Sequence, residues 1–143
     1  MQGRNKVKTL LGLVLAACMI SGVWLVTRTP APALTKVLAT YPVGSNGTLY
    51  VVLSDGGGAT VPATYRYYLY KRMDDTSQAL ASLRREGVAF LVTRDADGRV
   101  EIEGEVVKIA VKKAVYSFNT PTLFRHEGGY TAVDVWLQAQ PGE

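Results

Sequence analysis

The sequence contains very few of the residues that bind metals or form disulfides. Its 143 residues include one cysteine, Cys18, and one histidine, His126. Because no cysteine follows position 18, the remainder of the chain cannot form an internal disulfide, and it is long enough to fold without one. A zinc site would have to combine His126 with carboxylates alone, so we expect no metal.

Sequence motifs of catalysis are missing as well. No serine lies in a Gly-x-Ser-x-Gly elbow, so a Ser-His-Asp triad would need an arrangement that the sequence does not indicate. The pair Asp74-Asp75 fits a helix start, and the alternating glutamates of residues 101–105 fit a solvated strand face. We therefore expect that the chain is not an enzyme and that it has no cofactor and no small-molecule substrate.

Two loops resemble ligand-binding loops only in part. The glycines Gly56–Gly58 lack the Lys-Ser/Thr of a phosphate loop, and no helix start follows them, so a turn between strands is the favoured interpretation. Residues 95–98, Asp-Ala-Asp-Gly, begin like a calcium loop. Arg99 and Val106 then stand where such a loop needs oxygen ligands, so Asp97-Gly98 is predicted to be a hairpin turn instead.

The formal net charge of +4 arises entirely near the N-terminus. Up to position 30 the only charged residues are Arg4, Lys6, Lys8 and Arg28. The other twelve basic residues are matched by twelve acidic ones, so the rest of the chain sums to zero. A basic field for nucleic acid is therefore not indicated.

Residues 9–26 form an uncharged, mostly apolar segment. As a helix it would be roughly 27 Å long, close to the thickness of the hydrocarbon core of a bilayer. Three basic residues precede it and one follows closely, which keeps the N-terminus cytoplasmic by the positive-inside rule. The sequence thus predicts a signal anchor in a bacterial inner membrane, with residues 28–143 in the periplasm.

Two other interpretations of this segment remain open. Leu-Ala-Ala-Cys at residues 15–18 matches a lipobox, so that Cys18 would carry a lipid and become the first residue of a lipoprotein. A cleaved secretory signal is the other alternative, and all three export the remaining chain. The predicted organisation is a membrane segment at residues 1–28, a Pro/Ala spacer at 29–36 and a β-rich domain at 37–143.

The rest of the sequence shows mainly the period of two that is typical of strands. One helix is predicted after the N-cap Asp75, with Gln78 completing a capping box and Gly87 ending it. Asn46-Gly47 predicts a hairpin turn, and residues 119–129 are expected to form an irregular loop. The predicted strands are 37–43, 49–53, 64–72, 88–93, 100–105, 106–118 and 130–137. The expected fold is therefore α+β, a mainly antiparallel sheet with one short helix, preceded by a single transmembrane helix.

The strand at residues 64–72 has an unusual alternation of arginine and tyrosine. One face carries Tyr65, Tyr67 and Leu69, and both side-chain types on the other face are enriched at protein interfaces. The alternative is a cross-strand ladder under the predicted helix. With the loop after residue 53 placed beside this strand in one patch, the residues predicted to contact a partner are Arg66, Tyr68, Tyr70, Arg72 and Asp55.

The segment VVLSDGGGATVPATYRYYLY resembles an uncharacterised family of small bacterial membrane-anchored proteins. In that family the motif Ser-Asp-Gly-Gly-Ala-Thr follows a strand and precedes an aromatic strand. Ser54–Gly57 and Ala59-Thr60 match it here, with Gly58 as an additional residue. The resemblance covers about 25 residues, implies a location in the envelope, and implies no activity.

Two functions from different classes are consistent with these features. The first is a membrane-tethered protein whose periplasmic domain binds another envelope protein, such as a toxin or phage component in an immunity or phage-exclusion role. The second is a structural or assembly accessory of an envelope complex that uses the transmembrane helix itself for contacts. Both involve the membrane through residues 9–26.

Overall fold

The computed structural model describes residues 32–57, 62–120 and 122–140, which belong to one compact unit, Pro32–Glu143. The predicted membrane segment lies outside these ranges, and no helix within them is long and apolar enough to cross a bilayer. The described elements are β1 (Leu34–Val43), β2 (Gly47–Ser54), β3 (Thr64–Lys71), α2 (Thr76–Glu86), β4 (Leu91–Thr93), β5 (Arg99–Glu103), β6 (Val106–Val111), β7 (Val115–Phe118), β8 (Thr122–His126) and β9 (Gly129–Ala139).

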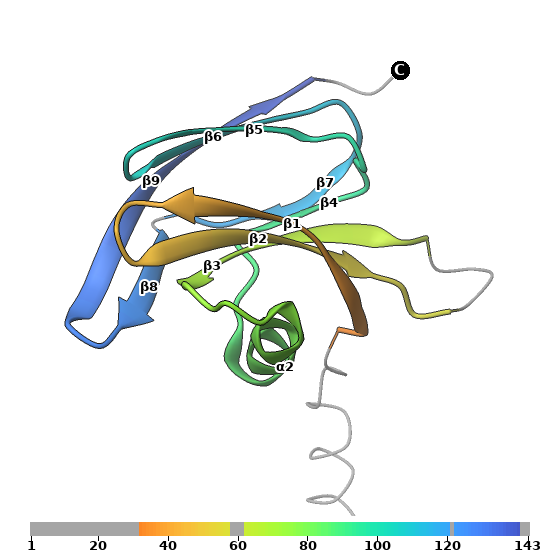
Figure 1. Ribbon diagram of the computed structural model, residues 1–143. Coiled ribbons are helices and arrows are strands. Elements are labelled where there is room, and N and C mark those ends of the chain that lie inside the picture. The colour runs from red at the N-terminus through yellow and green to blue at the C-terminus, as the bar shows by residue number, and fades with distance from the viewer. Residues whose placement is uncertain (1–31, 58–61, 121, 141–143) are drawn as a thin grey trace, which may run out of the picture. The chain divides into compact units, whose positions relative to one another are not determined.

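These strands form two sheets (Figure 1). The five-stranded sheet has the order β1-β2-β3-β4-β7, and the four-stranded sheet has the order β5-β6-β9-β8. Every pairing is antiparallel except β6 with β9, which is parallel. The predicted α+β fold, mainly antiparallel with one short helix, is confirmed for this part of the chain.

The main core lies between the two sheets. Strands β2 and β3 point Leu49, Val51 and Tyr67 into it. The four-stranded sheet contributes buried side chains that are at most 4 % exposed, which are Val107, Ile109, Val111, Phe124 and Val133. Burial of these side chains is the main stabilising term, at roughly 25 cal/mol per Å² of apolar surface.

A second core fills the space between the five-stranded sheet and α2, which covers the face opposite the other sheet (Figure 1). It contains Tyr50 and Tyr68 from the sheet and Ala79 and Leu83 from the helix. The Tyr50 hydroxyl donates to the Lys71 carbonyl at 3.2 Å and accepts from the Met73 backbone N–H at 3.0 Å. The buried Tyr50 hydroxyl thus holds the connection between β3 and α2 in place.

Helix α2 has the predicted N-cap Asp75 and the predicted C-terminal Gly87, whereas the reciprocal hydrogen bond of Gln78 that would complete a capping box does not occur among the described residues. The Asp75 carboxylate accepts a hydrogen bond from the Ser77 backbone N–H at 2.7 Å, which satisfies one of the unpaired donors at the helix start. Gly87 caps the other end and donates to the Leu83 carbonyl. The guanidinium of Arg84 also donates to the Leu34 carbonyl, which ties the helix to β1.

The predicted hairpin between residues 88–93 and 100–105 is wrong. Strand β4 pairs with β3 and β7, whereas β5 pairs with β6 in the other sheet. Asp97-Gly98 therefore lies in a connection that crosses between sheets. The hairpin turn is at Gly104, where a φ of +64° suits glycine, and the predicted strand 106–118 is divided into β6 and β7 in separate sheets.

Three further predictions need correction. The first hairpin has its positive φ at Gly44, +56°, and Gly47 instead pairs with Val43 as the first residue of β2. Strand β1 begins at Leu34, inside the predicted spacer 29–36, because Leu34 packs in the second core and is only 2 % exposed. The predicted loop 119–129 contains β8, which pairs with β9.

Asp95 organises the connection between β4 and β5. Its side chain accepts hydrogen bonds from the backbone N–H groups of Asp97 at 3.1 Å and Lys112 at 2.6 Å, and the residue is 3 % exposed. Burial alone raises the pKa of this carboxyl, but the hydrogen bonds from Lys112 and Asp97, together with the charge and backbone N–H of Lys113, outweigh burial, so the pKa lies below its usual value. The loop that resembles the start of a calcium site is therefore stabilised by the carboxylate of Asp95.

Gly98 in the same connection allows close packing against β3. A Cβ on Gly98 would lie 2.5 Å from the Tyr67 hydroxyl.

We predict that Asp95→Ala lowers the free energy of unfolding at neutral pH by about 2–4 kcal/mol, because two charge-assisted hydrogen bonds disappear from a buried site. Since the folded pKa is depressed, this contribution is present above the unfolded pKa and is lost as the pH falls through the folded pKa. The difference between the two proteins should therefore shrink below about pH 4 in urea titrations. Asp97→Ala, an exposed neighbour, is the control, and an equal loss in both variants would contradict the assignment.

Candidate functional site

The face of β3 that was predicted to contact a partner is largely covered. Tyr68 is 1 % exposed beneath α2, so its prediction as a contact residue is wrong. The alternative interpretation, a cross-strand ladder under the helix, applies to this residue. Arg66 is half-buried, and its Nε is buried with no hydrogen-bond partner among the described residues. Tyr70 is partly exposed and hydrogen-bonds the Glu86 carboxylate through its hydroxyl.

Asp55 lies at the other end of the sheet from Arg72. In the β2–β3 register Ser54 pairs with Thr64 at one end, and Gly47 pairs with Lys71 at the other, roughly 25 Å away at 3.4 Å per residue. The predicted common patch of the loop with the whole arginine–tyrosine face is therefore wrong.

The loop itself contains the turn that the sequence predicted. Asp55 Oδ1 accepts from the Gly57 backbone N–H at 2.9 Å, and Gly57 has a φ of +66°. Residues 58–61, which complete the loop, lie outside the described ranges.

Two adjoining hollows occur where β3 ends, with volumes of about 540 and 400 Å³. They share Lys71, His126 and Glu127 and form one surface, which we call the end groove. It includes two of the predicted contact residues, Tyr70 and Arg72. Its other lining residues are Ser45, Asn46, Leu69, Glu86, Val88, Leu123, Arg125, Gly128 and Tyr130.

Packing of β8 against β2 positions one wall of the end groove. A Cβ on Gly47 would lie 2.6 Å from the Phe124 ring. The ring can therefore pack at this position only because residue 47 is a glycine. Phe124 is 4 % exposed, and the His126 ring lies 6.0 Å from it. His126 Nδ1 accepts from the Gly128 backbone N–H at 3.0 Å, which fixes the imidazole over the β8–β9 turn.

The end groove combines basic and apolar groups. Lys71, Arg72 and Arg125 are exposed and outnumber the acidic residues Glu86 and Glu127. Glu86 accepts a hydrogen bond from the Tyr70 hydroxyl. Three apolar side chains stand open to solvent beside them, Val88 at 81 %, Tyr130 at 70 % and Leu123 at 57 % exposed. Exposed aromatic and aliphatic groups next to arginine are typical of surfaces that bind another protein.

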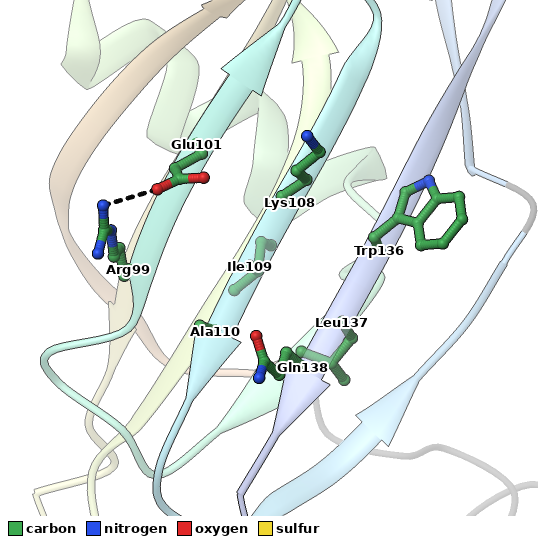
Figure 2. Close-up of a pocket in the computed structure, with 8 residues that line it drawn as sticks. All are labelled: Arg99, Glu101, Lys108, Ile109, Ala110, Trp136, Leu137 and Gln138. Atoms are coloured by element: carbon green, nitrogen blue, oxygen red, sulfur yellow. Dashed lines mark ion pairs between the residues drawn. The ribbon is translucent and has the colours of Figure 1, made fainter.

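A third hollow, of about 350 Å³, lies on the outer face of the four-stranded sheet (Figure 2). Trp136 on β9 is 68 % exposed there, beside Lys108 on β6 and Glu101 on β5, which are cross-strand neighbours. We call this surface the tryptophan groove. It is lined by Arg99, Glu101, Lys108, Ile109, Ala110, Trp136, Leu137 and Gln138.

The charges around the tryptophan groove are paired with one another. Arg99 and Glu101 approach to 2.7 Å (Figure 2), and Lys108 approaches Glu103 at 2.8 Å. The hydrogen bond and charge of Glu103 raise the pKa of Lys108. These exposed pairs add little stability, but they leave the groove without a surplus of either sign.

Metal coordination receives no support from the described residues, because no three of their His, Cys, Asp or Glu side chains converge as a metal site would require. Sequence reasoning missed both Trp136 and the β8–β9 wall. Trp136 could have been found, since it stands between Val135 and Leu137 and so points away from the core.

Comparison with models of protein families, with curated proteins and with solved structures gave no match. The surfaces are therefore interpreted from their own geometry and chemistry.

We predict that Gly47→Ala destabilises the domain by about 1–3 kcal/mol, since the added methyl group overlaps the Phe124 ring and forces the wall of the end groove to shift. Chemical denaturation measures the loss. Gly56→Ala is the matched control, because a Cβ there meets nothing within 4 Å. Equal stability of both variants would mean that Phe124 does not pack against β2 as described.

Proposed function

We propose that this chain is a membrane-tethered binding protein of the bacterial envelope, anchored through residues 9–26, with residues 28–143 in the periplasm. Its end groove captures another envelope protein, in keeping with a role in immunity or phage exclusion. The observation that carries the proposal is the cluster of exposed apolar side chains bordered by basic ones in the end groove, an arrangement typical of interaction sites.

The position of the end groove supports this proposal. The chain enters the domain at Pro32, and Leu34 pairs with Ser54 at that end of the sheet. Val43 pairs with Gly47 at the opposite end, next to the groove, and ten residues of β1 span roughly 30 Å. A partner would thus dock at the end of the sheet opposite to the one where β1 begins.

The chemistry of the end groove indicates the kind of partner. Lys71, Arg72 and Arg125 would pair with exposed carboxylates, while Tyr130 and Leu123 offer area to an apolar side chain. The expected partner segment is therefore acidic with at least one large apolar residue. Basic groups at the rim would mainly accelerate association, and the buried apolar contact would slow dissociation.

The test is photocrosslinking of the full chain in membranes, with a photoreactive residue at position 130. We expect one envelope protein to be captured, and the double variant Lys71→Glu/Arg72→Glu should reduce its yield at least about tenfold, because two attractions become repulsions. A photoreactive residue at Tyr116, which is 54 % exposed on β7, is the control and should not capture the same protein. Equal capture from both positions, or capture that the double variant leaves unchanged, would refute the proposal.

Replacing residues 1–27 by an unrelated signal anchor separates this function from the alternative of an assembly accessory. Capture at position 130 should persist after the exchange, because the binding surface is in the domain. Loss of capture despite correct export would favour contacts made by the transmembrane helix instead.

A further inference from the structure

We propose that the tryptophan groove binds a neutral oligosaccharide. This is a ligand site separate from the end groove, and it stands whether or not the protein partner exists. Its volume of about 350 Å³ falls at the lower end of the range of about 300–1,000 Å³ found for small-molecule sites.

Trp136 provides the stacking surface. Its side chain stands on the outer face of β9 and is 68 % exposed, although an indole is among the most costly side chains to leave in water (Figure 2). The C–H groups on one face of a pyranose ring are apolar and electropositive, so they pack against the negative face of an indole. Because the indole is largely exposed, this face is open to such stacking.

Hydrogen-bonding groups lie to one side of Trp136 at the spacing of neighbouring strands, and the indole ring points away from β6 (Figure 2). Gln138 follows on the same side of β9, and Lys108 and Glu101 complete the row that begins at Trp136. Together these side chains offer both donors and acceptors, and each sugar hydroxyl needs both. Ala110 pairs with Gln138 in the register, and its small side chain leaves the bottom of the groove open.

Charge pairing leaves the tryptophan groove without a surplus charge that would favour a charged ligand. Arg99 is occupied by Glu101 and Lys108 by Glu103, at 2.7 and 2.8 Å. Among the lining residues an anion meets no unpaired basic group, and a cation meets no unpaired carboxylate. Hydroxyl groups can bond to the free lone pairs and N–H groups while both pairs remain intact.

A second copy of the chain fits this groove less well. Trp136 is the only large, strongly exposed apolar side chain among the residues that line it, whereas stable dimers bury extended apolar cores. The polar surroundings would lose water without gaining matched partners. A small ligand of hydroxyl groups satisfies them individually.

The chain offers a direct probe, because its only tryptophans are Trp24 and Trp136. The full-length variant Trp24→Phe in detergent micelles therefore reports on the groove alone. Titration with chitotriose and with maltotriose should change its emission saturably for at least one of them, with a dissociation constant of about 0.1–10 mM. No saturable change with either sugar at about ten times that concentration would overturn the proposal.

Equilibrium dialysis of the same sugars tests the residues. Trp136→Ala should weaken binding at least about tenfold and Gln138→Ala about threefold, with thermal unfolding close to that of the parent because both side chains are exposed. Lys71→Glu/Arg72→Glu is the control and should bind sugar normally. Unchanged binding by Trp136→Ala, tighter binding of a sulfated oligosaccharide, or self-association that Trp136→Ala abolishes would each contradict the inference.

Discussion

Burial of β2 and β3 on both faces is the constraint on which the rest of the structure depends. Adjacent residues of β3 point in opposite directions, so that Tyr67 enters the core between the sheets and Tyr68 enters the core under α2. Two separate layers must therefore form on the same pair of strands. Neither the four-stranded sheet nor the single helix could bury its apolar face without them, and the buried hydroxyl of Tyr50 links this pair of strands to the helix connection.

This constraint also determines where binding can occur. With its central strands covered, the five-stranded sheet has few exposed groups beyond its ends and edges. The end groove lies at one of those ends, where β3 stops and the β8–β9 turn approaches it. The tryptophan groove lies on the outer face of the other sheet, which no element covers within the described ranges. The two proposed ligands therefore occupy surfaces that can bind independently, one through charge and apolar contact and the other through stacking.

The local features of the fold were predictable, and its long-range pairings were not. Asp75 and Gly87 delimit the helix by local hydrogen bonds, and the period of two correctly assigned Tyr67 and Tyr68 to opposite faces. The same period cannot say which strand pairs with which, so β4 and β5 were joined although they lie in different sheets. Of the residues that line the end groove, the sequence had led us to select Tyr70 and Arg72. It could not identify the wall around His126, because only β8 pairing with β9 brings that residue to the end of β3.

Native-state hydrogen exchange of the full chain tests the double burial of β2 and β3 most directly. If these strands support both layers, the backbone amides of residues 48–53 and 65–70 should exchange only through global unfolding, with a free energy that follows denaturant as the whole domain does. The edge strand β5 should exchange by smaller local openings. Exchange of residues 48–53 as fast as that of β5, or their opening while the second sheet stays protected, would contradict the account.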